Sequence, residues 1–202
     1  MARIFIGIDL PPAGRSELRR VQAELRHLAV WGKNEVGWVA AETFHLTVRF
    51  LGEVEAAQVE RIEAECRMAV EGLGPFRLSL GRLGFLPSQR RPRSIVVGVG
   101  GDLAALTRLW QQIEGATHGL GGQREGRGFH PHVTLGRFRR NAPPPESIHL
   151  QEGAEGAEGV SVRPLEFVVS AIEIKESFLL PQGARHVRRA SIPLRRGKNL
   201  RS

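Results

Sequence analysis

Two short segments of this chain repeat one pattern: a histidine, an apolar residue, a threonine and a second apolar residue. The first covers residues 45–48 (His-Leu-Thr-Val) and the second covers residues 132–135 (His-Val-Thr-Leu). Successive side chains of a β-strand point to opposite faces, so this alternation predicts two strands that are polar on one face and apolar on the other. The fold must therefore bury both apolar faces while both His-Thr faces look into a cleft.

The surroundings of the two motifs are also alike. Each motif is preceded by a strand-like apolar segment with a glycine, at residues 4–9 and 94–100, and then by a segment with apolar residues at helical spacing. The two copies are offset by about 90 residues, which indicates a duplicated strand-helix-strand unit. Another helix is expected over about 55–71, and further strands near 76–80, 165–175 and 186–194. We expect the first motif strand to stop at Gly52.

The length and composition fit one compact domain over residues 1–202. The chain is 41% hydrophobic and 25% charged, which suffices for a substantial core. A Pro- and Gly-rich segment at about 141–160 is expected to be a flexible surface loop, and the basic tail at about 195–202 to be frayed. The N-terminal segment reads neither as a signal peptide nor as a membrane span, which predicts a cytoplasmic protein with no membrane association.

The charge and the single cysteine narrow the classes of partner and chemistry. A net charge of +8 and a pI near 11.1 favour a polyanionic partner such as RNA, although the arginine-rich composition is equally compatible with a bias in genomic bases. Cys66 has no second cysteine with which to form an internal disulfide. It falls on an apolar helical stripe with Val59, Ile62 and Ala69, so a buried, inert thiol is expected.

The paired motifs fit proton transfer at phosphorus. Histidine exchanges protons near neutral pH, and a threonine two residues later places a hydroxyl beside the imidazole, where it can hold a phosphate oxygen. An in-line displacement needs a base behind the attacking water and an acid beside the leaving oxygen, which His45 and His132 can supply. Thr47 and Thr134 are then candidate phosphate ligands. Arg49 has the strand parity to join His45 in the cleft, but a solvated charge on a strand explains it equally well.

Three other interpretations compete with catalysis by two histidines. His130 and His132 form a His-x-His pair that could ligate a metal, but no carboxylate is near in sequence to complete the site. The glycines at 98–101 hint at a nucleotide loop, yet Leu103 occupies the third glycine position, so a turn in which Asp102 caps a helix is favoured. A basic RNA-binding module without chemistry would instead use arginines on phosphates, namely Arg90, Arg91, Arg93, Arg139, Arg140, Arg188 and Arg189.

These residues resemble the two-histidine phosphoesterase superfamily, and within it the RNA 2′,3′-cyclic phosphodiesterases, also called 2′-5′ RNA ligases. The similarity covers most of the chain and extends to IDLPP at 8–12, HLTVRFLGE at 45–53, GRLGFLP at 81–87, RPRSIVVGV at 91–99, FHPHVTLGR at 129–137 and ESFLLPQG at 176–183. The resemblance implies an α+β, bilobal fold. Two antiparallel sheets related by a pseudo-twofold would line a central active-site cleft, with helices on the outside.

The resemblance also implies roles for individual residues. His45 would be the general acid that protonates the leaving 3′-oxygen, and His132 the general base that activates water. Thr47 and Thr134 would bind the phosphate, and the product would be a 2′-phosphate. Arg137 matches the Thr-Leu-x-Arg pattern of the family, although simple alternation puts it on the face opposite His132; either a β-bulge redirects it or its role is structural.

The implied substrates are RNA with 2′,3′-cyclic phosphate ends, or cyclic nucleotides. The chemistry would need no metal and no cofactor, and it would allow ATP-independent 2′-5′ RNA ligation. We expect a monomer. The chain departs from many members of the family at two positions, with Val96 in place of Trp and His186 in place of Tyr.

Overall fold

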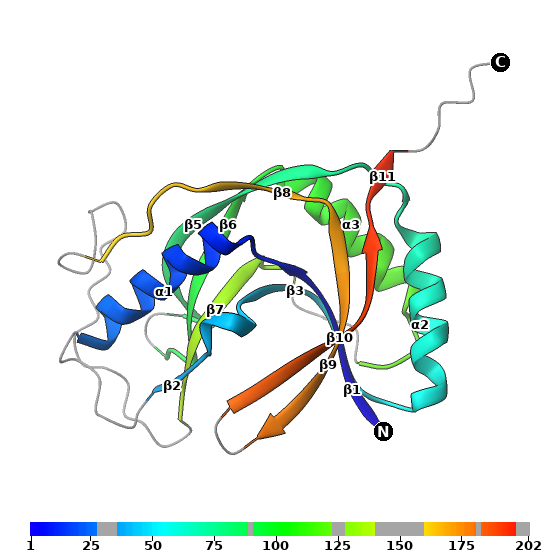
Figure 1. Ribbon diagram of the computed structural model, residues 1–202, viewed down its shortest axis with the longest axis horizontal. Coiled ribbons are helices and arrows are strands. Elements are labelled where there is room, and N and C mark those ends of the chain that lie inside the picture. The colour runs from blue at the N-terminus through cyan, green and yellow to red at the C-terminus, as the bar shows by residue number, and fades with distance from the viewer. Residues whose placement is uncertain (28–35, 89–90, 123–127, 140–159, 181–182, 197–202) are drawn as a thin grey trace.

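Both histidine motifs form strands in the computed structural model, which describes residues 1–27, 36–88, 91–122, 128–139, 160–180 and 183–196 (Figure 1). The elements are β1 (Ala2–Asp9), α1 (Pro12–His27), β2 (Val36–Trp38), a 3-10 helix (Ala41–Thr43), β3 (His45–Val54), α2 (Ala56–Ala69), β4 (Glu71–Gly72), β5 (Phe76–Leu86), β6 (Ser94–Gly101), α3 (Leu103–Ala116), β7 (His132–Phe138), β8 (Glu166–Val169), β9 (Ala171–Leu180), β10 (Gly183–Pro193) and β11 (Arg195–Arg196). The first motif opens β3 and the second opens β7.

The two motif strands lie side by side at the centre of a curled sheet. The strand order is β10-β9-β1-β3-β7-β6-β5-β8, with β2 added beside β7 and with four strands on either side of the β3–β7 junction. Each half places the strand that precedes its helix next to its motif strand, β1 beside β3 and β6 beside β7. The predicted mixed α+β fold and its internal duplication are confirmed, and the two halves join edge to edge into one continuous sheet.

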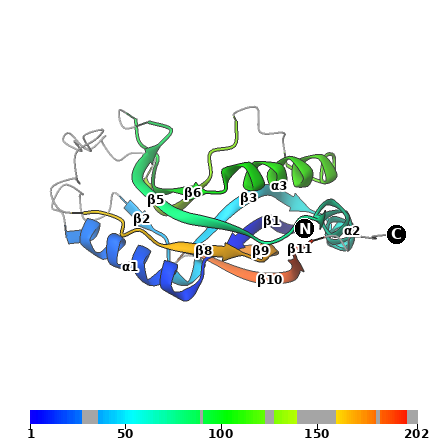
Figure 2. The same ribbon diagram turned by 90° about the horizontal axis from the view of Figure 1, so that it is seen from above.

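The helices lie outside the sheet, where their apolar faces reach the core. Figure 2 shows α1 on one side of the strands and α3 on the other, with α2 beside α3. The buried apolar stripes of the helices are Leu18, Val21 and Leu25 on α1, Ile62 and Cys66 on α2, and Leu106, Leu109 and Ile113 on α3. Burying each large side chain of this kind contributes about 1.5–3 kcal/mol.

Two local predictions on the helices are confirmed. Asp102 caps α3, because its side chain accepts a hydrogen bond of 2.9 Å from the backbone N–H of Ala105. Cys66 is fully buried, and burial raises the pKa of its thiol to about 12. A thiol with that pKa stays protonated near neutral pH and is a poor nucleophile. Cys66 is therefore a small apolar residue of the core.

Other sequence-based boundaries were wrong. Strand β3 does not stop at Gly52, because it continues to Val54 and pairs with β1 along its length. The single strand expected over 165–175 is two, β8 and β9. The tail expected to fray at Arg195 instead forms a short parallel pair with β4 at Arg195–Arg196. Nearly all of the expected loop at 141–160 lies outside the described residues, as does the tail beyond Arg196.

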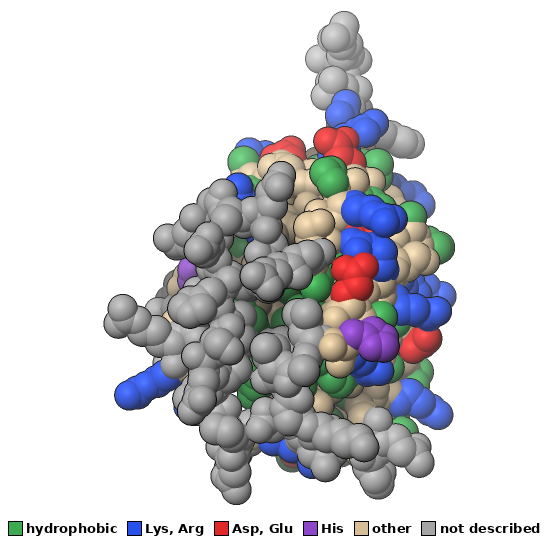
Figure 3. All heavy atoms as spheres, turned by 90° about the vertical axis from the view of Figure 1, so that its left-hand side faces the viewer, with side chains coloured by type: hydrophobic (Ala, Val, Ile, Leu, Met, Phe, Trp, Pro, Cys, Tyr) green, Lys and Arg blue, Asp and Glu red, His purple; other side chains and the backbone are tan. Residues whose placement is uncertain are grey.

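The surface facing the viewer in Figure 3 carries charge of both signs. Basic side chains run along one side of the described surface, and acidic side chains and a histidine lie among them. The net charge of +8 therefore does not form a patch of one sign on this face. No helix in the described ranges is long and apolar enough to span a membrane.

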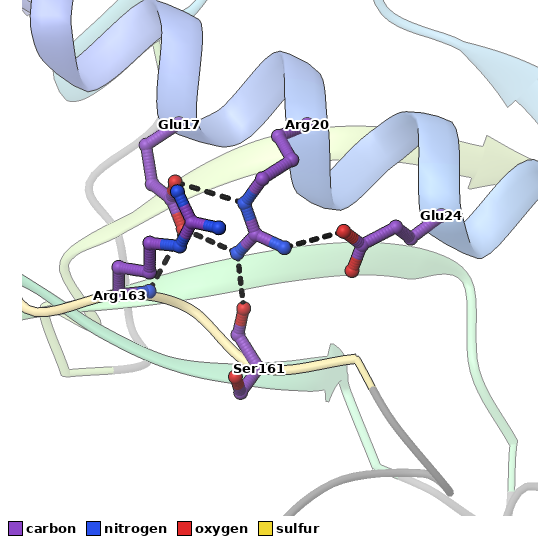
Figure 4. Close-up of polar contacts among 5 residues, drawn as sticks. All are labelled: Glu17, Arg20, Glu24, Ser161 and Arg163. Atoms are coloured by element: carbon purple, nitrogen blue, oxygen red, sulfur yellow. Dashed lines mark hydrogen bonds and ion pairs between the residues drawn. The ribbon is translucent and has the colours of Figure 1, made fainter.

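A cluster of ion pairs fastens the segment before β8 to helix α1 (Figure 4). The guanidinium of Arg20 donates to both oxygens of Glu17, at 3.0 and 2.5 Å, to Glu24 at 2.5 Å and to the backbone carbonyl of Ser161 at 2.6 Å. The backbone N–H of Arg163 donates to Glu17 at 2.8 Å. Glu17 is only 8% exposed, so its carboxylate is a buried acceptor shared by two segments that are far apart in sequence.

We predict that Glu17→Gln destabilises the protein at neutral pH but not in acid. The hydrogen bonds from Arg20 are the main reason that the pKa of Glu17 lies below its ordinary value of 4.5. A lowered carboxyl pKa stabilises the folded state fully above pH 4.5, and this contribution is lost as the pH falls through the folded pKa. Urea unfolding should show a loss of about 1–3 kcal/mol near pH 7 that shrinks below pH 4.5. A difference that is independent of pH would contradict this account.

Candidate active site

The two His-Thr motifs meet across a single residue pair. Strand β3 runs antiparallel to β7, and the pair that joins them is Leu46 with Val133, the apolar residue at the centre of each motif. In this register the histidine of each motif comes opposite the threonine of the other, His45 toward Thr134 and His132 toward Thr47. An approximate twofold axis therefore passes between Leu46 and Val133, and it relates the two motifs.

Each histidine is held by the same backbone contact. The ring nitrogen Nδ1 of His45 lies 2.7 Å from the carbonyl oxygen of Thr43, and Nδ1 of His132 lies 2.6 Å from that of His130. A carbonyl oxygen can only accept, so Nδ1–H must be the donor in both rings. This fixes the tautomer and leaves Nε2 of each neutral ring with a lone pair, able to take a proton and to return it.

A β-bulge follows each motif and changes which side chains face the cleft. Opposite β1, the register skips Val48 of β3; opposite β6, it skips Leu135 of β7. One extra residue reverses the alternation beyond it. The fifth residue after each histidine therefore joins the His-Thr face, and these residues are Phe50 in the first strand and Arg137 in the second.

The bulges determine on which face of the sheet the side chains of Arg49 and Arg137 lie. Arg137 is redirected by a bulge, the first of the two expected alternatives, and its exposed side chain lines the cleft. The expectation that Arg49 shares the face of His45 was wrong. Arg49 is 5% exposed and forms a buried ion pair with Glu114 of α3. The bulge at Val48 turns it away from the cleft, so we assign it no contact with substrate.

An open cleft of 1340 Å³ lies over the His-Thr face. His45, Thr47, Thr134 and Arg137 line it, whereas Arg49 does not. His132 is outside the lining, although it is partly exposed and shares a strand face with Thr134. The β9–β10 hairpin contributes a further wall, made of Ser177, Leu179, Leu180, Gly183, Ala184, Arg185 and His186.

Aromatic rings backed by guanidinium groups also line the cleft. Arg3 lies over the ring of Phe50 at 5.1 Å, and Arg26 lies over Trp38 at 5.3 Å. Phe50 is 46% exposed, which is high for a phenylalanine on a central strand. Neither ring was predicted as a site residue from the sequence. The alternation that assigns Phe50 to the core face is valid only without the bulge, and no residue marks the bulge in the sequence.

The environment of His45 disfavours its charged form. Its ring packs on Phe5, with centroids 4.6 Å apart, and edge-on against His186 at 5.2 Å. Gly7 lies beside this pair of rings, and a Cβ there would lie 3.1 Å from the carbonyl oxygen of Leu46, so the glycine allows β1 and β3 to approach closely. Burial is the main cause that lowers the pKa of His45 to about 4, while the bond to the carbonyl of Thr43 acts in the opposite direction.

An ion pair also lies beside His45. Lys175 forms an ion pair with Asp9, and Asp9 is the register partner of His45 in β1. The positive charges of Lys175 and His186 lower the pKa of His45 and the carboxylate of Asp9 raises it, but each of these effects is smaller than that of burial. Burial also lowers the pKa of His186. The two histidines thus make the same contact to a backbone carbonyl, but the contact of His45 is partly buried and that of His132 is exposed.

The residues considered for a metal site and for an RNA-binding module lie in several parts of the fold. Across the described part of the chain, no group of three or more His, Cys, Asp or Glu side chains is arranged to hold a metal ion. Of the arginines considered for an RNA-binding module, Arg139 lines the cleft. Arg188 and Arg189 pair with Glu173 and Glu176, at 3.8 and 3.0 Å. Arg90 and Arg140 lie outside the described residues.

Comparison with solved structures supports the fold. The chain superposes on the Thermus thermophilus protein TT0787 with a TM-score of 0.74 and 24% identity, over 97% of this chain and 99% of that one. It superposes on E. coli LigT complexed with 3′-AMP with a TM-score of 0.71 and 23% identity, over 96% and 98% of the two chains.

Comparison of sequences identifies the family. The family described as LigT like Phosphoesterase matches residues 8–96. An RNA 2′,3′-cyclic phosphodiesterase of Aeropyrum pernix is 36% identical over 82% of this chain and 88% of its own length. One of Archaeoglobus fulgidus is 29% identical over 90% and 94%. The chain therefore belongs to the LigT-like phosphoesterases, the family of the RNA 2′,3′-cyclic phosphodiesterases.

Proposed function

We propose that this protein opens 2′,3′-cyclic phosphates at the ends of RNA by hydrolysis, giving 2′-phosphates, and that His45 and His132 carry the protons. One observation carries the proposal. Two imidazoles from the two halves of the sheet make the same Nδ1–H bond to a backbone carbonyl, and each is left with one nitrogen for the substrate. Family membership supplies the substrate class, because the relatives that establish it are RNA 2′,3′-cyclic phosphodiesterases.

In this reaction the oxygen of a water molecule forms a bond to phosphorus while the bond from phosphorus to the 3′-oxygen breaks. His132 accepts the proton that the water gives up, and His45 donates a proton to the departing 3′-oxygen. Both protons are accounted for, and neither step requires a metal or a cofactor. The 2′-oxygen keeps the phosphate.

The remaining cleft residues would hold the phosphate and the nucleoside. The hydroxyls of Thr47 and Thr134 can donate to the non-bridging oxygens, and the guanidinium of Arg137 can form a two-point contact with them as charge builds up. Phe50 presents the face of an exposed ring on the same side of the strand, where a base can stack. If the 5′-hydroxyl of a second RNA took the place of water, the product would be a 2′-5′ linkage formed without ATP.

The family resemblance implies that His45 is the acid and His132 the base, and the charge of the substrate makes this assignment compatible with the low pKa of His45. A general acid must hold its proton in the complex, and the free His45 has a pKa of about 4. A cyclic phosphate carries a negative charge, and an anion in contact with the imidazole favours the protonated form. Substrate binding would therefore raise the pKa of His45 and load the acid. We also propose that the substrates are RNA with 2′,3′-cyclic phosphate ends or cyclic nucleotides. The protein would act in the cytoplasm as a monomer.

We predict that removing either imidazole abolishes turnover without abolishing binding. His45→Ala and His132→Ala should each lower kcat for 2′,3′-cyclic AMP by a factor of about 10²–10⁴, the range typical of general acid–base catalysis. The affinity for 2′-AMP, measured by calorimetry, should change much less. If hydrolysis survived in the double variant, the two-histidine mechanism would be wrong. If the wild-type protein bound RNA without hydrolysing the cyclic phosphate, an RNA-binding module without chemistry would be the better interpretation.

We predict that His45 is neutral in the free protein and becomes protonated in the complex. Nitrogen NMR should show the Nδ1–H tautomer and a pKa of about 4, and addition of 2′-AMP should raise that pKa. Because 4 lies below the ordinary value of 6.5, the unfolded chain binds more protons in this window, and His45 lowers the stability of the fold as the pH falls from 6.5 toward 4. A pKa that 2′-AMP leaves unchanged would remove His45 from the role of acid.

A further inference from the structure

The side chain of Gln22 on helix α1 reaches the bulge that turns Arg137 toward the cleft. Its amide nitrogen Nε2 donates to the carbonyl oxygen of Leu135 at 2.9 Å and to that of Val39 at 2.7 Å. Leu135 is the extra residue of the bulge in β7. The backbone N–H of Val39 also donates to the Leu135 carbonyl, at 2.9 Å. One buried amide thus ties together α1, the chain after β2 and the bulge.

We infer that Gln22 is a positioning residue: it fixes the bulge at Leu135 and thereby points Arg137 at the phosphate. This inference rests on the proposed function, since it assumes that Arg137 holds the phosphate. Gln22 is 6% exposed, and both hydrogens of its amide are used on carbonyls. A polar side chain this buried costs free energy unless its hydrogen bonds are made, and both bonds from the Gln22 amide nitrogen go to the segments around the bulge.

The residue after the bulge shows how tightly this region is packed. A Cβ on Gly136 would lie 2.7 Å from Cγ1 of Val36 and 3.1 Å from the ring of Trp38, so β2 lies directly on the backbone of β7. Arg137 follows at the next position and pairs with Gly37 in the same register. The backbone that carries the guanidinium is therefore held by β2 on one edge and by Gln22 behind the bulge.

The other half of the sheet also has a buried polar side chain of a helix beside its bulge. Glu114 of α3 is 9% exposed and pairs with Arg49, which follows the bulge at Val48 in β3. Gln22 directly follows the fully buried Val21, and Glu114 directly follows the fully buried Ile113. Each helix thus reaches the motif strand of the opposite half: α1 follows β1 but contacts β7, and α3 follows β6 but contacts β3. A buried polar side chain from a helix thus lies beside each bulge, although Gln22 contacts a backbone carbonyl and Glu114 contacts a side chain.

The consequence of losing the bulge follows from strand parity. Without the extra residue, Arg137 would fall on the face of Val133, which is fully buried in the core. A bulge that fluctuates between positions would therefore misplace the guanidinium, while His132 and Thr134, which precede the bulge, would keep their places. The effect of a change at Gln22 should appear in the contact between Arg137 and the phosphate.

Gln22→Met tests this inference, because methionine has a similar length and no amide. We expect kcat/KM for 2′,3′-cyclic AMP to fall on the order of 10-fold, and the affinity for 2′-AMP to fall as well. Glu17→Gln is the matched control: it removes a buried polar contact from the same helix but touches no residue of β7. At a temperature where melting curves show all variants folded, the control should keep its kcat/KM. Gln22→Leu, which also lacks the amide and leaves no charge in this buried position, serves if Gln22→Met does not fold.

A double-mutant cycle with Arg137→Ala separates positioning from general damage. If Gln22 acts through Arg137, adding Gln22→Met to Arg137→Ala should cause no further loss of affinity for 2′-AMP. Full additivity, or a Gln22→Met protein with wild-type kinetics, would overturn the inference. An inactive wild-type protein would instead refute the proposed function, so the two failures are distinguishable.

Discussion

The site depends on one backbone pairing, that of Leu46 with Val133. It joins two four-stranded halves into a continuous sheet, and it sets the register in which each histidine comes opposite the threonine of the other motif. Both residues are fully buried, so sliding one strand by a residue would move an apolar side chain into the cleft and a histidine into the core. The burial of these two side chains on one face thus fixes the relative positions of the histidines and threonines on the other face.

A duplicated backbone supplies two equivalent imidazoles, but general acid–base catalysis needs two that differ in protonation. The neighbours of the His45 ring keep it neutral in the free protein, and in the proposed mechanism the anionic substrate supplies its proton affinity. His45 packs against Phe5 and His186 beside the Asp9–Lys175 ion pair, and burial lowers its pKa to about 4. The second difference lies beyond the bulges, where corresponding positions hold Phe50 and Arg137. A symmetric fold therefore gives a cleft with an aromatic surface from one strand and a guanidinium from the other.

Strand alternation was sufficient to predict that His45 shares a face with Thr47 and His132 with Thr134, helical spacing predicted the buried Cys66, and the family resemblance implied the fold class. Strict alternation puts Arg49 in the cleft and Phe50 in the core, which is wrong, and it leaves Arg137 undecided, because each of these residues follows a bulge. A bulge depends on what lies behind the strand, here Gln22 for one and the Glu114–Arg49 pair for the other, and these contacts join segments far apart in sequence. The end of β3 was missed for a similar reason, since Gly52 at a φ of 72° stays within a strand that β1 holds on its edge.

The central claim is that two histidines, without a metal, open the cyclic phosphate by breaking its bond to the 3′-oxygen. The most direct measurement is phosphorus NMR of an RNA oligonucleotide with a 2′,3′-cyclic end, incubated with the protein in the presence of EDTA. The account predicts that the cyclic signal is replaced by that of a 2′-phosphate at an undiminished rate. A 3′-phosphate would reverse the assignment of the leaving oxygen, and a reaction that EDTA stops and added metal restores would contradict the mechanism.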